Sequence, residues 1–336
     1  VSTYGPKHYG ADLVRVICGD DDPDRDIYRE EEIEAPFSGE YPGRHQPIDA
    51  GSYAVVPNSP ELAALESFTV QAWIWPTTPH KGEQGLITRW DADPALGFAL
   101  LIDDTGALAM RVGDGCGNMA EISTGVPLAM RRWYLVSGSY DALTGEVNVC
   151  QEPINVDHES HKVASVTQQA KLGPFAKSDS PLMFAAFSMM LSTGKPGSQC
   201  HFNGKIDRPR VTARALSPAE RSAMASDAQP HERNTRVIAA WDFSRDIGGS
   251  AISDVGPNGL HGKSVNLPSR GCKGFNWSGT EQNWGHAPEE YGAIHFHDDD
   301  LYDAGWETDF EYIVPDDLRS GVYAVRLKTD DDEWYV

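Results

Sequence analysis

Short segments that alternate apolar and polar residues fill the middle of this sequence. The stretch 68–76 reads FTVQAWIWP and alternates with period two until a proline ends it. Turn signals such as DDTG at 103–106 and DALTG at 141–145 separate these segments, and no long helical pattern lies between them. Further strand candidates are 85–90, 97–102, 107–112, 133–140, 146–150, 182–187, 205–211 and 237–243. This spacing predicts a mainly β fold built as an antiparallel sandwich.

One short helix is expected after these strands. Ser217 supplies an N-cap side chain, Pro218 occupies the first helical position, and Glu220 completes a capping box. The pattern predicts a helix over residues 218–225.

Two strand candidates lie outside the sandwich region. Residues 13–18 and 322–327 are both short and rich in β-forming types, so we expect them to pair in one smaller sheet. Residues 333–336 begin another apolar run at which the chain ends. We therefore expect a β-hairpin that is truncated in its second strand. We also expect that this sequence is the N-terminal portion of a longer natural protein.

These patterns predict four parts along the chain. Residues 1–50 hold the N-terminal strand and an acidic connection, and 51–243 form the antiparallel sandwich. Residues 244–310 form an irregular connection that is rich in glycine and tryptophan, and 311–336 begin a further β domain.

The chain is strongly acidic. It has 28 lysines and arginines against 50 aspartates and glutamates, a formal net charge of −22. Nucleic acid and anionic membrane are excluded as partners, because a polyanion would be repelled. An ordinary acidic surface and an adaptation to high salt both remain open as interpretations.

The cysteines and the apolar runs bear on the compartment. The five cysteines are scattered and form no CxxC pair, which favours reduced thiols over a zinc site or a disulfide framework. No apolar run reaches membrane-spanning length, and residues 1–10 lack the blocks of a signal peptide. We expect a cytoplasmic protein.

The richest local constellation is HFHDDD at 295–300. If this segment is a strand, His295, His297 and Asp299 project from one face, because side chains alternate with period two. Two imidazoles and a carboxylate are a reasonable set for a divalent metal. Two other readings stay open: hydrogen-bonded histidines before a polar turn, or an interface anchored by Tyr302 and Trp306.

Other chemistries have weaker signals. The sequence has no GxSxG elbow for a serine hydrolase. Cys272, between Arg270 and Lys273, is a possible nucleophile, although an ordinary loop thiol is the simpler reading. Calcium or sugar binding would use loop aspartates or exposed tryptophans, for which turn and packing roles are expected instead. The residues concerned are Asp91, Asp93, Asp103, Asp104, Trp90, Trp133 and Trp277.

Three segments together resemble a laminin-G-like, concanavalin-type jelly roll. They are FTVQAWIWP at 68–76, WYLVSGSYDALTGEVNVC at 133–150 and FNGKIDRPRVTARALSPAE at 202–220. The resemblance covers 51 to about 243 and implies the same sandwich that the strand pattern predicts.

A wider set of motifs resembles the large subunit of the N,N-dimethylformamidase family. In order, the motifs are DLVRVICGDDDP, AAWDFS, LHGKSVNLPSRGCKGFNW and YGAIHFHDDDLYDAGWETDFEYIVPDDLRSGVYAVRL. The resemblance implies an amidohydrolase that converts dimethylformamide and water to dimethylamine and formate. It also implies a hetero-oligomer with a small subunit and further large subunits, and a mononuclear iron held by tyrosinates and a glutamate.

Those iron ligands belong to a C-terminal domain of the family that this sequence does not reach, so none is assigned to a residue here. The expected role of this chain is therefore a non-catalytic scaffold or oligomerisation part. The alternative is a carbohydrate- or ligand-binding jelly-roll module without catalysis.

Overall fold

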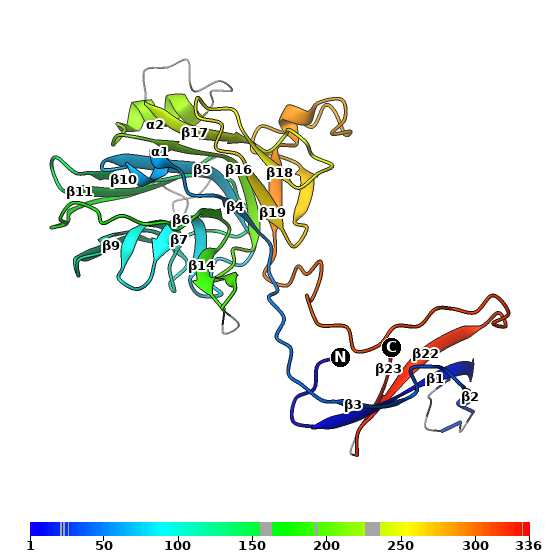
Figure 1. The fold of residues 1–336 in the computed structure, drawn as a ribbon. Helices are drawn as coiled ribbons and strands as arrows, with labels where there is room; N and C mark the ends of the chain where they lie inside the picture. The colour runs from blue at the N-terminus through cyan, green and yellow to red at the C-terminus, as the bar shows by residue number, and fades with distance from the viewer. Residues whose placement is uncertain are drawn as a thin grey trace. The chain divides into compact units, whose positions relative to one another are not determined.

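A computed structural model describes the chain except for residues 21, 23, 26, 155–162, 192–193, 226–235 and 331. The described residues form two compact units (Figure 1). The sandwich unit comprises residues 49–302, and the small unit combines residues 1–48 with 303–336.

The sandwich unit has two layers of antiparallel strands (Figure 1). One layer runs β12-β11-β10-β5-β16, with bounds Ala164–Gln169, Glu146–Pro153, Tyr134–Asp141, Phe68–Pro76 and Gly204–Thr212. The other runs β19-β4-β13-β6-β7-β8-β9, with bounds Gly262–Val265, Tyr53–Val56, Leu182–Phe184, Gln84–Asp91, Leu96–Ile102, Ala107–Asp114 and Met119–Pro127. The predicted concanavalin-like sandwich is confirmed.

Further elements complete this unit. β17 (Val237–Asp242) and β18 (Ala251–Asp254) connect the layers at one edge, between β16 and β19. β20 (Ser269–Cys272) pairs with β21 (Ala293–Phe296), which pairs with β16. The remaining elements are the hairpin β14 (Phe187–Met190) and β15 (Pro196–Gln199), helices α1 (Pro60–Ala63) and α2 (Pro218–Ala225), and the 3-10 helix η3 (Pro288–Glu290).

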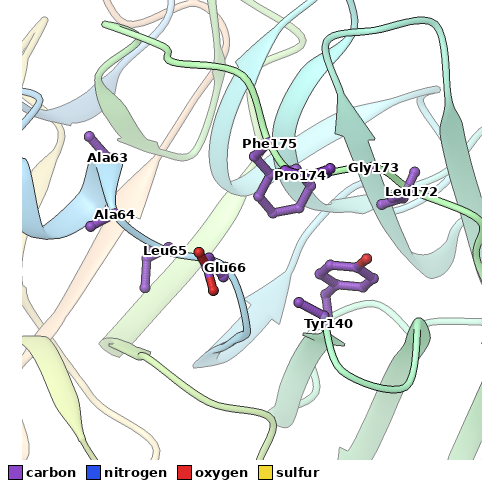
Figure 2. A pocket seen from close by; sticks show the side chains of 10 residues that line it. Ala63, Ala64, Leu65, Glu66, Tyr140, Leu172, Gly173, Pro174 and Phe175 are labelled. Atoms are coloured by element: carbon purple, nitrogen blue, oxygen red, sulfur yellow. The ribbon is translucent and has the colours of Figure 1, made fainter.

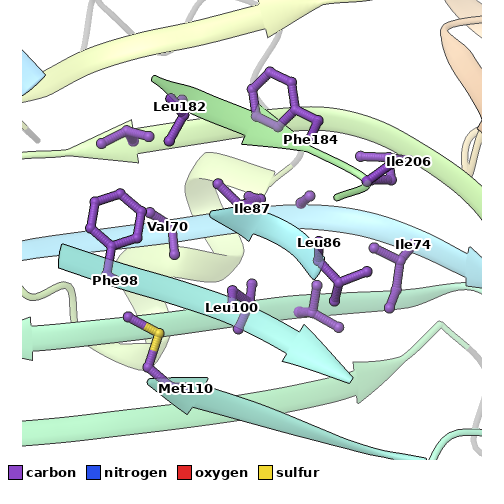
Figure 3. Close-up of a cluster of buried hydrophobic side chains, with 14 of the residues drawn as sticks. Val70, Ile74, Leu86, Ile87, Phe98, Leu100, Met110, Leu182, Phe184 and Ile206 are labelled. Atoms are coloured by element: carbon purple, nitrogen blue, oxygen red, sulfur yellow. The ribbon is translucent and has the colours of Figure 1, made fainter. Parts of the chain in front are cut away.

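The core lies between the two layers. Val70 and Ile74 of β5 point toward Phe98 and Leu100 of β7, and all four side chains are buried (Figure 3). The alternation in 68–76 thus places every second residue in this core. Burying each such side chain contributes about 1.5–3 kcal/mol relative to leaving it in water.

The other face of β5 is covered by α2. Gln71 and Trp73 donate side-chain hydrogen bonds to the carbonyls of Arg221 and Ala225, each over 3.3 Å. The predicted capping box starts this helix: the Ser217 amide donates to Glu220 Oε2 over 2.9 Å, and the Glu220 amide donates to Ser217 Oγ over 3.4 Å. Two otherwise unpaired helix-end amides are thereby satisfied.

The small unit joins segments from opposite ends of the sequence. β1 (His8–Cys18) pairs antiparallel with β22 (Val322–Lys328), with Leu13 opposite Val325. This confirms the predicted small sheet. β2 (Arg29–Ile33) and β3 (Gly39–Pro42) also pair with β1, and β23 (Glu333–Tyr335) pairs with β22. Its apolar cluster is small: Tyr9, Ala11, Leu13, Ala35, Phe37 and Leu327 are buried.

The structure differs from the expected four-part division. The expected connection 244–310 holds β18, β19, β20 and β21 of the sandwich unit up to Tyr302, and only residues from Asp303 belong to the small unit. Arg270 explains part of this order, because its guanidinium donates to the carbonyls of Phe243, Arg245, Gly249 and Ala251 over 2.9–3.2 Å. One side chain thus fastens four backbone positions of the segment.

Candidate functional site

The HFHDDD segment begins in β21 and ends in a turn. β21 stops at Phe296, so the expected strand through Asp299 is not formed. His295 and His297 do lie together, with ring centroids 4.1 Å apart. Asp299, however, is exposed in the turn. The one-face arrangement expected for the three ligands is therefore wrong for Asp299.

The acid that contacts His297 is Asp300. His297 Nδ1 and Asp300 Oδ2 are 3.2 Å apart, and Ser52 Oγ donates to the same carboxylate oxygen over 2.7 Å. The Ser52 amide donates to the His297 carbonyl over 2.8 Å, and the His297 amide donates to Ser52 Oγ over 3.0 Å. This network ties the end of β21 to the chain just before β4.

His295 is held as a neutral imidazole. Burial, the neighbouring His297 and the Lys205 ammonium lower its pKa to about 4. Across the residues that the structure describes, no three His, Cys, Asp or Glu side chains gather closely enough to hold a metal ion. The alternative of hydrogen-bonded histidines before a polar turn holds for His297, whereas His295 Nε2 is buried without a hydrogen-bond partner among the described residues.

Cys272 lies in β20 beside this network. Burial raises the pKa of its thiol, which the Lys205 ammonium only partly offsets. The thiol donates to the Ser269 carbonyl over 3.4 Å. A thiol whose pKa is raised is a poor nucleophile at neutral pH, so the geometry favours the ordinary loop thiol.

The two expected interface aromatics are placed in different units. Tyr302, at the end of the sandwich unit, has 72% of its surface exposed. Trp306 belongs to the small unit, where its indole N–H donates to the Pro47 carbonyl over 3.3 Å. Their role as interface anchors stays a prediction.

The calcium and sugar candidates have local roles. Asp103 accepts hydrogen bonds from the amides of Thr105 and Ala107 and from Ser123 Oγ, as a turn aspartate does. Trp90 is buried beneath the Arg111 guanidinium, which lies 5.6 Å from its ring centroid. The ammonium of Lys273 lies 3.7 Å from the ring centroid of Trp277.

The sandwich unit also carries a pocket of about 370 Å³ that the sequence did not indicate. Tyr140, Leu172 and Phe175 supply apolar walls, and Glu66 brings a carboxylate (Figure 2). Burial raises the pKa of Tyr140, and so do Asp114 and Asp141. The phenol therefore stays protonated, and the pocket offers a hydroxyl and a carboxylate around an apolar floor.

A cluster of tyrosines and glutamates is the candidate to compare with the tyrosinate and glutamate ligands of the iron that the family resemblance implies. Tyr28 and Tyr335 lie with ring centroids 6.0 Å apart, next to Glu30 and Glu333. Each phenol donates to a carboxylate, and burial with these neighbours raises the pKa of Tyr335. Both carboxylates are already paired with cations, Glu30 with Arg326 and Glu333 with Lys328, so this cluster does not fit the group.

Two family models match the chain. One describes the concanavalin A-like lectin/glucanases superfamily and matches residues 49–220. The other is described as N,N-dimethylformamidase beta subunit-like, C-terminal, and matches residues 269–336. Together they touch both units.

Curated relatives match almost the whole chain. The N,N-dimethylformamidase beta subunits of Paracoccus aminophilus and an Alcaligenes species are each 35% identical over 98% of this chain. The chain spans 44% of the length of either relative. The resemblance inferred from the sequence motifs is thus confirmed.

Solved structures show weaker likeness. The crystal structure of a protein from Bacteroides ovatus, described as a putative carbohydrate binding protein, has a TM-score of 0.47 at 14% identity, and the match covers 70% of this chain and 65% of that protein. A heptameric SAP-like pentraxin from Limulus polyphemus has a TM-score of 0.36 at 17% identity, covering 55% of this chain and 80% of its own.

Within the described residues no helix is long and apolar enough to span a membrane.

Proposed function

This chain belongs to the concanavalin A-like lectin/glucanases superfamily, and from its match to dimethylformamidase beta subunits we propose that it is the scaffold part of an amidohydrolase large subunit. The observation that carries the proposal is the extent of that match. It runs over 98% of the chain and therefore through both units, not through the sandwich alone. A shared jelly roll would not by itself extend into the small unit.

The proposed reaction of the whole subunit is hydrolysis of a small linear amide. Water adds to the formyl carbon of dimethylformamide, the C–N bond breaks, and the amine leaves with a proton as dimethylamine while formate remains. We place this chemistry in the remaining part of the subunit, because this chain spans 44% of the relatives' length and its described residues gather no three His, Cys, Asp or Glu side chains that could hold a metal ion.

The contacts of the described side chains support the proposed scaffold role. Asp300 of the HFHDDD turn accepts a hydrogen bond from Ser52, and Asp298 accepts from Lys81 and Asn203 of the same unit. A sandwich held this firmly offers a rigid support for a neighbouring catalytic domain. Its partners in this proposal are a small subunit and further large subunits, in the cytoplasm, where the five free cysteines stay reduced.

A chimera tests this function. The aligned part of the Paracoccus aminophilus beta subunit is replaced by this chain and produced with the partner subunit of that enzyme. We expect an assembled complex that releases dimethylamine from dimethylformamide. A matched chimera carrying Phe98→Ala, a core change, should lose assembly. A well-folded, correctly assembled wild-type chimera without activity would contradict the proposal.

The pocket beside Tyr140 favours a second candidate, a module that binds a small ligand. Its aromatic floor and single carboxylate are suited to a sugar or another small polar molecule. Calorimetric titration of the chain with a panel of oligosaccharides would test it. Binding that Tyr140→Ala removes and Leu143→Ala retains would favour the module, and no heat of binding would exclude it for those sugars.

A further inference from the structure

Two buried oxygen atoms without partners lie close to each other, one in β16 and one in the loop that follows β20. Asp207 of β16 lies opposite Trp73 of β5 and is 1% exposed, and its Oδ2 atom has no hydrogen-bond partner among the described residues. Asn276 Oδ1 is likewise buried and unpaired within the part of the chain that the structure describes. An acceptor that is buried without a donor costs free energy, so a donor is expected between the two.

Gly274 shows that the two oxygens border one small space. A Cβ atom added to this glycine would lie 2.6 Å from Asp207 Oδ2 and 2.9 Å from Asn276 Oδ1. Both distances are too short for a carbon atom, so glycine is required here. The loop and β16 therefore meet at two acceptors, and neither atom has a hydrogen to offer while Asp207 is ionised.

The Asn276 amide cannot supply the donor without a loss elsewhere. Its Nδ2 donates to the Glu289 carbonyl over 3.0 Å, and the Gly274 amide donates to the Glu290 carbonyl over 2.8 Å. Rotating the amide would offer Nδ2 to Asp207, but it would turn Oδ1 toward the Glu289 carbonyl, which is also an acceptor. A proton on Asp207 leaves both loop bonds in place and gives Asn276 Oδ1 its donor.

The charges in the strands around Asp207 act in both directions. Burial raises the pKa of Asp207 to about 6, the Arg208 cation opposes this rise, and Asp242 of β17 adds to it. The Arg208 guanidinium lies 5.0 Å from the ring centroid of Phe275, and Asp242 pairs with Arg245 over 3.3 Å. The neighbouring cations are thus engaged with other groups, and burial determines the direction of the shift.

The remaining charged groups near this carboxyl belong to the loop side. The Glu290 carboxylate accepts hydrogen bonds from the amide and the hydroxyl of Ser278, each over 2.9 Å. The Lys273 ammonium lies 3.7 Å from the ring centroid of Trp277. Trp73, which packs on the loop from β5, brings no charge. None of these groups takes the place of the missing donor.

We propose that, below neutral pH, Asp207 holds a proton in the folded chain and donates it from Oδ2 to Asn276 Oδ1, which fastens the 274–276 loop to β16 as a pH-sensitive latch. The loop carries Phe275, whose ring stacks on Trp73 with centroids 4.3 Å apart. Loss of the proton leaves a buried carboxylate beside an acceptor, so the loop and this ring stack are held less firmly. The inference does not depend on the proposed amidohydrolase function.

The pH window follows from the direction of the shift. In the unfolded chain an aspartate titrates near about pH 4. Between that value and the folded pKa of about 6, the folded chain binds a proton that the unfolded chain has lost. The stability that the latch contributes is therefore present in full below about pH 4 and is lost as the pH rises through 6.

Asp207→Asn tests the latch, because the amide carries no charge and offers Nδ2 to Asn276 Oδ1 at every pH. Melting temperatures of the full chain and of the variant are compared from pH 5 to pH 7.5. We expect the two to agree within about 1 °C at pH 5 and the variant to melt about 5 °C higher at pH 7.5. Asp104→Asn, which removes an exposed loop carboxylate, is the matched control and should show no such pH-dependent gain.

The proton itself is followed by infrared spectroscopy. The carbonyl band of a protonated carboxyl should be present in the wild type at pH 5, be absent in Asp207→Asn, and fade with a midpoint near pH 6. Asn276→Ala removes the acceptor of this proton, so its midpoint should move to lower pH.

Three results would overturn the latch. The first is an Asp207→Asn variant that is less stable than the wild type at pH 7.5 or fails to fold. The second is a carboxyl that stays ionised over the whole range, which is the result expected if a water molecule donates to both oxygens. The third is an unchanged midpoint in Asn276→Ala, because Asn276 would then not receive the proton.

Discussion

The two units of this chain are stabilised in different ways. The sandwich unit is built on one continuous apolar core between its layers, in which Phe68, Leu100 and Ile206 are fully buried. Among its described residues the small unit has an apolar cluster of six buried side chains, and it relies on Arg326, which pairs with Asp12, Glu30 and Glu32. A small sheet has too little apolar area to be stable by burial alone, so charge pairing and the joining of distant segments matter more there.

The largest expected effect comes from the core of the sandwich. Phe98→Ala removes a ring whose centroid lies 4.6 Å from that of Phe68, and it leaves a cavity between the layers. We expect a loss of about 3–5 kcal/mol in the free energy of unfolding of the sandwich unit. Chemical denaturation measures it, with Leu143→Ala, at a 92% exposed position, as the control. A loss under about 1 kcal/mol would mean that the layers are not closely packed.

In the small unit the corresponding test is Arg326→Met. The change leaves three carboxylates facing each other without a cation, while the methionine retains the apolar stem. We expect the small unit to lose about 1–3 kcal/mol, less than a fully buried pair because Glu32 is partly exposed. Arg25→Met, which removes an exposed arginine paired with Asp20 and Asp22, should change stability by under about 0.5 kcal/mol. Equal losses of stability in the two variants would contradict the view that the small unit depends on the ion pairs of Arg326.

The sandwich unit should be sensitive to acid at one buried carboxylate. Hydrogen bonds from the Asn118 side chain and the amides of Gly173, Cys116 and Asn118 lower the pKa of buried Asp114 to about 2, despite its burial. A carboxylate with a lowered pKa stabilises the fold above its unfolded pKa of about 4. That contribution is lost as the pH falls toward 2.

Asp114→Asn should therefore cost the sandwich unit about 1–2 kcal/mol at pH 7, and the difference from wild type should vanish near pH 2. Denaturation curves from pH 7 to pH 2 measure it. A difference that is independent of pH would show that Asp114 acts through packing and not through its charge.

The smallest effect is expected at the start of α2. Ser217→Ala removes the N-cap oxygen that accepts a hydrogen bond from the Glu220 amide. The loss should be about 1 kcal/mol, seen as a lower unfolding free energy of the sandwich unit. Ser222→Ala, an exposed position within the same helix, serves as the control and should stay within about 0.5 kcal/mol. A loss equal to that of the control would mean that the cap contributes nothing.

The contrast also explains what the sequence could predict. Side chains of Phe68–Pro76 alternate between the core on one face and α2 on the other. The periodicity of the sequence therefore predicts this strand of the sandwich. The sequence also predicts the pairing of the strands that contain Leu13 and Val325, because both are rich in β-forming residue types and lie outside the sandwich. The strands of 244–302 were missed, because they have four residues each and are positioned by contacts such as those of Arg270.

The site was harder to predict than the fold. The spacing in the sequence correctly predicts that the two histidines lie together. The acid beside them is Asp300 and not Asp299, because β21 ends at Phe296 and Ser52 hydrogen-bonds to the Asp300 carboxylate. Ser52 is 248 residues away from Asp300 in sequence, so no local pattern could show that contact.

The most direct test of the scaffold role is an assay of this chain by itself. The purified 336-residue chain is incubated with dimethylformamide, dimethylamine is quantified, and bound iron is measured on the same sample. The proposal predicts no dimethylamine above the buffer control and no stoichiometric iron, alongside an active chimera. Release of dimethylamine by this chain alone would contradict it, because the catalytic centre would then lie within these two units.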